Sequence, residues 1–227
     1  MTRREQIQGA YRFLGGKEST FYDGMMTCST FAGTAVSRLV WSIGKEKNLE
    51  YLTRALSGVP EDFSGRLLEV PVGTGVLTMP VYAGLPDAEI ECLDCSPDMM
   101  AAARRRAAGA GLVNVRFTRG DVGALPFADE SFDIVLSLNG FHAFPDKEAA
   151  YRETRRVLKP GGTFCGCFYV KGENRRTDWF IDKLYRPKGF FTPPFETADS
   201  LRKRLGGMYA RSEVGTVEGV ACFRCVK

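Results

Sequence analysis

The sequence predicts an α/β fold in which a mostly parallel sheet carries helices on both faces. From Gly65 onward, short apolar strands alternate with helical stretches, a pattern typical of parallel strands joined by helices. The chain has 227 residues, 44% hydrophobic and 26% charged, which is enough to build the core of one large domain. The expected strands are 66–70, 88–93, 113–118, 132–138 and 161–169, and the expected helices are 75–84, 97–109 and 147–157.

Capping residues mark the ends of the expected helices. Ser96 is placed to cap the helix at 97–109, Pro97 suits its first position, and Asp98 favours the positive end of the helix dipole. Alanines and arginines follow, and a glycine ends this helix. The next helix ends at LKPGG (158–162), which we expect to turn the chain into the fifth strand.

The two ends of the chain differ from this pattern. Residues 1–60 carry apolar residues at helical spacing, so we expect a helical N-terminal cap packed on a core domain at 61–227. Residues 171–204 are rich in aromatic residues, prolines and charges, and their place after the fifth strand suggests an inserted lid. The alternating tail (209–227) predicts a final antiparallel hairpin.

Composition bears on location, partners and metals. The formal net charge of +4 permits an anionic partner without requiring one. The sequence lacks both a stretch of roughly 18 apolar residues and a secretory apolar region, so we expect a cytoplasmic protein without a membrane span. The motifs CLDC and CFRC raise the alternative of a zinc site. Since residues i and i+3 of a strand point to opposite faces, we favour reduced structural thiols and no metal. The oligomeric state is left open.

The first expected strand leads into a loop that suits a polar ligand. In GRLLEVPVGTGVLT (65–78), Gly73 and Gly75 place backbone N–H groups at the start of a helix, and a tight turn without a ligand is the alternative. Asp94 ends the second strand 19 residues after Gly75, where a carboxylate can accept hydrogen bonds from a ribose diol. A dinucleotide fingerprint requires a third glycine at the position of Thr78, so an adenosyl cofactor fits better than a hydride-transferring dinucleotide.

Five motifs, in this order along the chain, resemble the class I S-adenosylmethionine-dependent methyltransferases, close to the group that includes the ubiquinone and menaquinone biosynthesis methyltransferases. They are E-x-P-x-G-T-G, L-D-x-S, G-D-x-x-x-L-P-F, S-F-D-I-V and R-V-L-K-P-G-G, within about residues 65–170. The resemblance implies a Rossmann-like, seven-stranded, mostly parallel sheet with a C-terminal antiparallel hairpin. It also implies S-adenosylmethionine as the cofactor and S-adenosylhomocysteine as its product.

The resemblance further implies roles for individual residues. Glu69, Gly73 and Gly75 would line the methionine and ribose end of the cofactor, and Asp94 would bind the ribose hydroxyls. The other implied contacts are Cys95 and Met99 beside the adenine, Asp121 and Val122 at its amino group and apolar wall, Asn139 and His142 after the fourth strand, and Tyr22, which would fold over the cofactor from the N-terminal cap.

Pro71 departs from the family pattern, because relatives carry glycine or alanine at this position of the loop. Proline holds φ at about −65° and has no N–H to donate. We therefore predict a negative φ at Pro71, which still lines the site, while Gly73 and Gly75 supply the positive φ and the close approach to a ligand.

The implied reaction is methyl transfer to oxygen or carbon of a small molecule. The segment after the fourth strand lacks both the N-P-P-Y element of enzymes that methylate exocyclic amines of bases and the Pro-Cys of cytosine C5 enzymes. His142, the single histidine, is the candidate general base, and packing against the cofactor is its alternative role. The aromatic lid suits an apolar or ring-shaped acceptor. The alternative functions are an RNA methyltransferase, although we expect the basic clusters to be solvated surface, and a non-catalytic adenosyl-binding protein.

Overall fold

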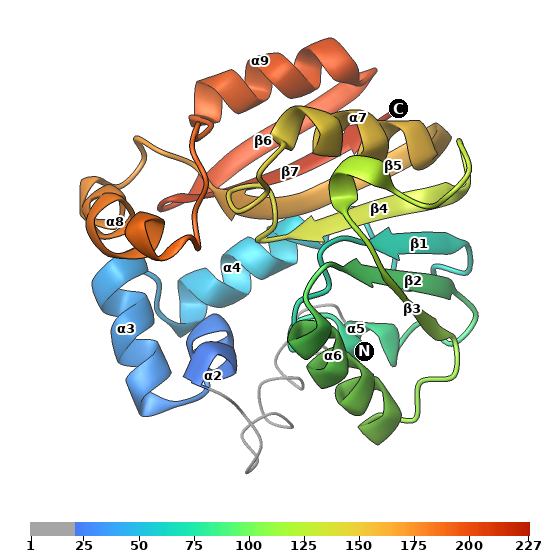
Figure 1. The fold of residues 1–227 in the computed structure, drawn as a ribbon, viewed down its shortest axis with the longest axis horizontal. Helices are drawn as coiled ribbons and strands as arrows, with labels where there is room; N and C mark the ends of the chain where they lie inside the picture. The colour runs from blue at the N-terminus through green and yellow to red at the C-terminus, as the bar shows by residue number, and fades with distance from the viewer. Residues whose placement is uncertain (1–20) are drawn as a thin grey trace.

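Seven strands form one sheet in the order β3-β2-β1-β4-β5-β7-β6 in the computed structural model, which describes residues 21–227 (Figure 1). The first five strands pair in parallel, and β7 runs antiparallel to both β5 and β6. This order confirms the expected seven-stranded α/β sheet with its C-terminal hairpin. The strands are β1 (Arg66–Glu69), β2 (Glu89–Asp94), β3 (Val115–Arg119), β4 (Phe132–Leu138), β5 (Leu158–Tyr169), β6 (Arg211–Val217) and β7 (Val220–Val226).

Helices cover both faces of the sheet. Neighbouring residues of β4 show the two layers, since Ile134 belongs to one buried cluster and Val135 to the other. Helices α4, α5 and α6 contribute to the first cluster, and α7 and α9 to the second. The helices are α2 (Phe21–Thr27), α3 (Phe31–Trp41), α4 (Lys45–Ala55), α5 (Met79–Tyr82), α6 (Pro97–Gly109), α7 (Lys147–Val157), α8 (Arg175–Phe180) and α9 (Ala198–Met208), with short turns η1 (Val122–Ala124), η2 (Ile181–Tyr185) and η3 (Arg186–Lys188).

Two expected elements differ from the observed ones by more than two residues at an end. The helix expected at 75–84 is reduced to the single turn α5, because the positive φ of Gly75 is incompatible with an α-helix. The LKPGG segment does not lie between elements but inside β5. Leu158 pairs with Phe132 and Thr163 with Ile134, so the residues between bulge out of the ladder.

The N-terminal helices and residues 171–190, which contain α8 and are called the α8 segment below, meet on one side of the molecule. The Thr177 hydroxyl of α8 donates to the carbonyl of Val40 in α3 at 2.8 Å. Helix α4 joins the core directly, with Tyr51 and Leu52 in the first cluster. Residues 1–20, which belong to the expected N-terminal cap, lie outside the described residues. Within 21–227, no helix is both long and apolar enough to cross a membrane.

Candidate functional site

The loop after β1 adopts the backbone that its glycines allow. Gly73 has φ +56° and Gly75 has φ +68°, whereas Pro71, which follows a cis peptide bond, is not among the residues with positive φ. The prediction that the last two loop positions carry the positive φ is therefore confirmed. The sequence did not predict the cis form of the Val70–Pro71 bond.

A second glycine makes room for Pro71. A Cβ at Gly140, in the loop after β4, would lie 2.4 Å from Cδ of Pro71 and 2.6 Å from the ring of Phe144. The proline thus packs against bare backbone on the neighbouring strand end. Sequence reasoning missed Gly140, and its signal was the glycine in SLNGF directly after an apolar strand.

Asp94 joins the ends of β1 and β2. One carboxylate oxygen accepts the Gly73 N–H at 2.8 Å, and the other accepts the Ser96 N–H at 2.9 Å. Asp94 is buried, and these bonds fix its carboxylate beside the glycine loop. Each carboxylate oxygen has a second lone pair, so Asp94 retains the capacity to accept from a diol.

The backbone of Gly73 is open to a ligand. Apart from Gly73 and its two chain neighbours, no atom of residues 21–227 lies within 4 Å of the position that a Cβ would take there. At Gly75, by contrast, such an atom would meet the Met79 side chain at 2.9 Å. The loop therefore presents Gly73 outward and packs Gly75 inward, which fits an adenosyl cofactor held against the backbone.

Glu69 lies below this loop in a buried polar cluster. Its carboxyl accepts the Tyr82 hydroxyl at 2.7 Å and the Cys92 thiol at 3.7 Å. Burial raises the pKa of Glu69 to about 8, and the hydrogen bond from Tyr82 opposes this increase. The hydrogen-bond partners of the Glu69 carboxyl are thus core side chains of β2 and α5.

The residues expected around the adenine follow β2 and β3. Cys95 is exposed, and Met99 on the first turn of α6 is half-buried. Asp121 caps η1 by accepting the Gly123 N–H at 2.8 Å, and Val122 is buried. Because β2 and β3 pair in parallel up to Asp94 and Arg119, these residues share one edge of the sheet.

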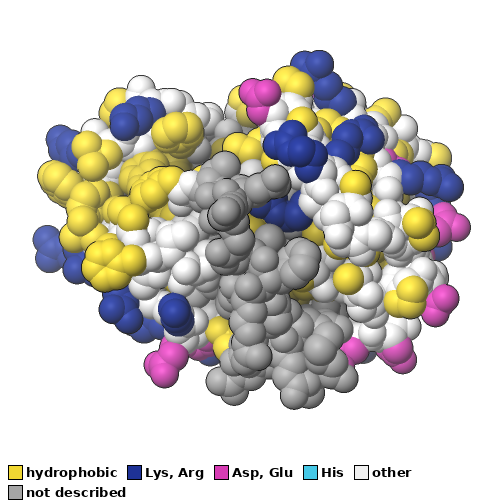
Figure 2. Space-filling view, turned by 90° about the horizontal axis from the view of Figure 1, so that it is seen from below, with side chains coloured by type: hydrophobic (Ala, Val, Ile, Leu, Met, Phe, Trp, Pro, Cys, Tyr) yellow, Lys and Arg dark blue, Asp and Glu magenta, His cyan; other side chains and the backbone are white. Residues whose placement is uncertain are grey.

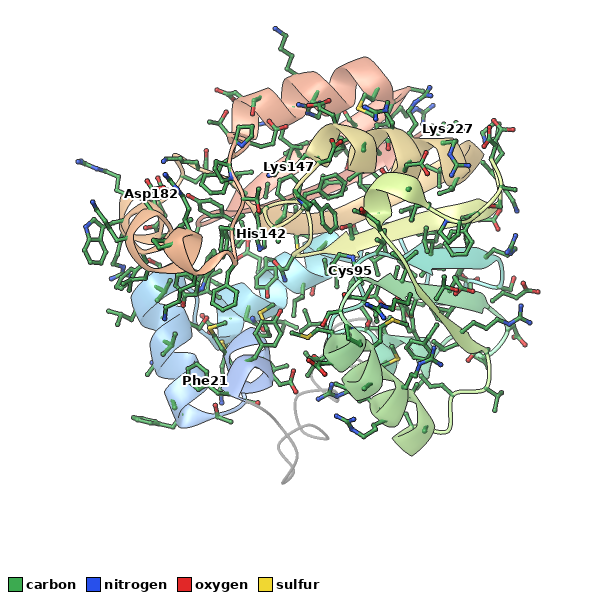
Figure 3. All side chains as sticks on the ribbon, viewed as in Figure 1. Phe21, Cys95, His142, Lys147, Asp182 and Lys227 are labelled. Atoms are coloured by element: carbon green, nitrogen blue, oxygen red, sulfur yellow. The ribbon has the colours of Figure 1, made fainter. Side chains whose placement is uncertain are left out.

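Asn139 and His142 follow β4 at the same edge. Asn139 has φ +56°, and its N–H donates to the carbonyl of Cys167 at 2.7 Å. The ring of His142 stacks on Phe191 with 4.2 Å between centroids, and its Nδ1 accepts the Tyr169 N–H at 3.4 Å. Figure 3 shows His142 between the sheet and the α8 segment.

The environment of His142 keeps its imidazole neutral. Burial lowers the pKa of His142 to about 3, and the charge of Lys147 adds to this effect. Because Nδ1 accepts a hydrogen bond, the proton of the neutral ring is on Nε2. In this tautomer Nε2 carries the proton and has no free lone pair, so it is not poised to take a proton from a nucleophile.

Helix α2 is attached to the glycine loop by a buried ion pair. Asp23 meets Arg106 of α6 at 2.6 Å and accepts the Thr74 hydroxyl at 2.7 Å, while Arg106 also donates to the carbonyl of Thr74. The adjacent Tyr22 lies near two carboxylates, and desolvation, Asp23 and Asp94 raise its pKa to about 12. Sequence reasoning named Tyr22 but missed the roles of Asp23, Thr74 and Arg106.

The expected site residues are thus distributed unevenly. Those that the structure brings to the carboxyl edge of β1, β2, β3 and β4 are Pro71, Gly73, Asp94, Cys95, Met99, Asp121, Val122, Asn139 and His142, with Tyr22 of α2 close to Asp94. Gly75 packs beneath the loop and Glu69 faces the core. A separate cavity of about 530 Å³ between the starts of α7 and α9, lined by Lys147, Glu196 and Arg204 among others, includes none of these residues.

All seven cysteines are free thiols, and six of them are buried. In the described part of the chain, no group of three or more His, Cys, Asp or Glu side chains is arranged to hold a metal ion. Cys92 belongs to the Glu69 cluster, and the Cys222 thiol donates to the carbonyl of Tyr51 at 3.4 Å.

Comparisons with known proteins agree with this fold. A family model described as a methyltransferase domain matches residues 67–162. The chain is 42% identical over 115 residues to the demethylmenaquinone methyltransferase of Thermus thermophilus, covering 51% of this chain and 52% of that protein. It is 35% identical over 123 residues to the uncharacterized methyltransferase YcgJ of Bacillus subtilis, covering 53% of this chain and 47% of that protein. The chain thus spans about half the length of the curated relatives it matches.

Solved structures show the same architecture. The crystal structure of YcgJ superposes with a TM-score of 0.62 at 24% identity, covering 74% of this chain and 70% of that one. Phosphoethanolamine N-methyltransferase 2 of Haemonchus contortus, in complex with S-adenosyl-L-methionine, superposes with a TM-score of 0.63 at 20% identity, covering 88% of this chain and 47% of that one.

Proposed function

We propose that the protein transfers a methyl group from S-adenosylmethionine to a small-molecule acceptor, because residues 67–162 match a family model described as a methyltransferase domain and a relative of this part of the chain is named as a methyltransferase. The observation that carries the proposal is the pairing of an outward-facing Gly73 backbone with the buried carboxylate of Asp94. This pairing gives one place where a ligand can approach a backbone and meet a fixed acceptor for hydroxyl groups.

The residues present fit the cofactor at the carboxyl edge of the sheet. The proposal assigns Asp94 to the ribose hydroxyls, the Gly73 loop to the methionine end, and Asp121 with Val122 to the adenine. When bound, the sulfonium supplies an activated methyl group. An acceptor atom forms a bond to the methyl carbon as the carbon–sulfur bond breaks, its electron pair stays on sulfur, and the acceptor loses a proton.

The protein's task in this reaction is positioning and exclusion of water. The contacts of Asp23 support a role for α2, which carries Tyr22, in covering the cofactor. Asp23 pairs with Arg106 and accepts the Thr74 hydroxyl, and these two contacts fix the helix next to the glycine loop. The Nε2–H tautomer of His142 and its lowered pKa support orientation of the acceptor through Nε2 rather than proton abstraction.

We propose an apolar, ring-bearing acceptor that is methylated on carbon or oxygen. Aromatic rings line the side of His142 that faces the lid, with Phe191 against Trp41, Tyr169 and Tyr185. The Thermus thermophilus relative is named as a demethylmenaquinone methyltransferase, which supports a naphthoquinol as the first acceptor to test. A reducing compartment is consistent with seven free thiols.

Calorimetry tests the cofactor first. We expect S-adenosylmethionine and S-adenosylhomocysteine to bind, and Asp94→Ala to weaken both by about 1–3 kcal/mol, the cost of losing hydrogen bonds to a charged group. Asp98→Ala, at an exposed carboxylate on the first turn of α6, is the matched control and should leave binding unchanged. Absence of binding by the parent protein contradicts the proposal.

Acceptor class is tested with a deuterated methyl donor. The protein is incubated with the labelled cofactor and, in separate samples, with a naphthoquinol, a catechol or total RNA. Mass spectrometry then shows which product carries the deuterated methyl group. Label on the naphthoquinol supports the proposed acceptor. Label on RNA alone indicates an RNA methyltransferase, and cofactor binding without any transfer indicates an adenosyl-binding protein.

A further inference from the structure

The α8 segment and α3 present an exposed surface that combines large apolar side chains with basic ones. We call it the aromatic-basic surface. Figure 2 shows hydrophobic side chains gathered on the side of the molecule that carries α3 and α8, with Lys and Arg around them. Its residues are Leu39, Arg175, Arg176, Trp179, Lys183, Leu184, Arg186, Lys188 and Phe190.

The apolar members of this surface are unusually exposed for their size. Trp179 is 55% exposed, Leu184 46% and Phe190 58%, and Leu39 of α3 adds a further 55% exposed side chain. Their neighbours Thr177 and Ile181 are buried and face the protein. The inner side chains of the segment are thus packed against the protein, whereas its outer apolar side chains remain exposed and can bind a membrane or another molecule.

The charge of the segment is strongly biased. Between 171 and 190 it has six basic and three acidic residues, a net +3, while the whole chain carries +4. Within the described residues, Arg175, Lys183 and Lys188 have no salt-bridge partner. The positive charge is therefore available to an anionic surface.

The acidic residues of the segment are engaged within the protein. Asp178 accepts the Tyr169 hydroxyl at 2.7 Å, and Asp182 pairs with Lys171 at 2.8 Å. Glu173 accepts the Thr216 hydroxyl at 3.2 Å. Asp182 also pairs with Arg186 at 3.8 Å, so the carboxylates offset only part of the positive charge of this surface.

The surface is held in place by α3. The Arg176 guanidinium donates to the carbonyl of Arg38 at 3.0 Å and to the hydroxyl of Ser42, and Asn174 donates to the same hydroxyl at 2.9 Å. With Thr177 bonded to Val40, these contacts fix the orientation of α8. The exposed Trp179 therefore projects from a helix whose position is fixed.

We propose that the aromatic-basic surface docks on an anionic lipid bilayer, with Trp179, Leu184 and Phe190 entering the interfacial region. Tryptophan and phenylalanine flanked by lysine and arginine are the side chains that combine apolar burial with attraction to anionic headgroups. The net charge of the segment matches the sign of such lipids. A second protein is the less fitting partner, because lysine is depleted at protein interfaces and this surface contains Lys183 and Lys188.

The surface continues into the candidate site. Phe190 is exposed, and the next residue, Phe191, is buried and stacks on His142. A lipid-soluble acceptor leaving the bilayer at Phe190 would meet this aromatic cluster first. The delivery of an acceptor from the bilayer rests on the proposed function. Binding to the bilayer does not, because it can be measured without methyl transfer.

Vesicle flotation tests the inference on the full chain. We expect co-flotation with vesicles containing phosphatidylglycerol and little with vesicles of phosphatidylcholine alone. High salt should reduce the bound fraction, and the tryptophan emission of the chain should show a blue shift that Trp179→Ser abolishes. Trp179→Ser with Phe190→Ser, and separately Lys183→Glu with Lys188→Glu, should each lower the bound fraction at least about tenfold. Val113→Ser, at a residue 97% exposed on the other side, and Arg105→Glu on α6 are the matched controls.

Each alternative result overturns the inference. Unchanged binding in both double variants excludes this surface, as does absence of binding by the folded parent protein. A parent dimer that the Trp179 variant converts to monomer assigns the surface to a second copy, and tighter salt-dependent binding to RNA than to vesicles assigns it to nucleic acid. Calorimetry with S-adenosylmethionine on the same samples separates these outcomes from failure of the proposed methyl transfer.

Discussion

Asp23 of α2 and Arg106 of α6 form a buried ion pair with 2.6 Å between nitrogen and oxygen, and both also bond to Thr74 in the glycine loop. The Asp23 side chain is 2% exposed and that of Arg106 15%. The pair therefore joins three elements that are distant in the sequence. It also makes the position of Tyr22, next to Asp23, depend on the loop.

Arg106→Ala should destabilise the protein, because it removes the Arg106 guanidinium from beside the buried Asp23 carboxylate. Removing one partner of a buried pair costs about 3–5 kcal/mol, and the partial exposure of Arg106 places the expected loss near the lower end. Urea unfolding measures this loss. Arg105→Ala, the exposed neighbour on α6, is the control, and equal stability of the two variants would contradict the structural role of the pair.

Gly73→Ala should separate folding from ligand binding. The alanine is strained at φ +56° by about 1–2 kcal/mol, yet its methyl meets no described atom within 4 Å, so the protein should fold. The same methyl occupies the space proposed for the cofactor, and calorimetry should show at least a tenfold loss of affinity.

Gly111 provides the matched control for this experiment. It has φ +67°, also has open space, and lies after α6 away from the loop. Gly111→Ala should cost similar stability and leave cofactor affinity intact. If Gly73→Ala bound the cofactor as tightly as Gly111→Ala, the ligand would not approach the Gly73 backbone.

Glu69 should make the protein less stable as the pH rises. Burial raises the pKa of its carboxyl from 4.5 to about 8, so the folded protein holds a proton that the unfolded chain has already released. The stabilisation is fully present below about pH 4.5 and is lost as the pH increases toward 8. The total change is on the order of a few kcal/mol.

Glu69→Gln removes this titration while keeping a side chain of similar shape. Urea midpoints at pH 5.5 and 8.5 should fall with pH in the parent protein and fall less in the variant. Glu89→Gln, whose side chain is 72% exposed, should retain the parent behaviour. Parallel pH profiles for parent and Glu69→Gln would show that the carboxyl is not desolvated in the folded state.

His142 should remain neutral at pH 5–8. Its pKa is lowered from 6.5 to about 3, chiefly by burial, so stability is fully present above about pH 6.5 and is lost as the pH falls toward 3. The chain has one histidine, so the imidazole nitrogen shifts in an NMR titration of untagged protein report this residue alone. A titration midpoint near 6.5 would restore His142 as a candidate base; otherwise a pH profile of activity should show no inflection from it.

Local patterns were enough to predict most of the sheet. The strands at 132–138 and the helices at 97–109 and 147–157 coincide with β4, α6 and α7, because apolar runs and caps such as Ser96 act within a few residues. The helix start expected at Gly75 was wrong, because the positive φ that the sequence predicts for Gly75 is itself incompatible with an α-helix beginning at that residue. Similarly, the LKPGG segment became part of β5 through pairing with β4.

The sequence by itself determined the order of strands and helices, the positive φ at Gly73 and Gly75, and the placement of Asp94 at a strand end. These features depend on residue type and near neighbours. Only the tertiary structure decided that Gly140 accommodates Pro71, that Arg106 holds Asp23, and that Glu69 and His142 are desolvated. Such relationships arise when segments far apart in the chain pack together, and exclusion of water then sets the hydrogen bonds and the pKa values of the groups they enclose.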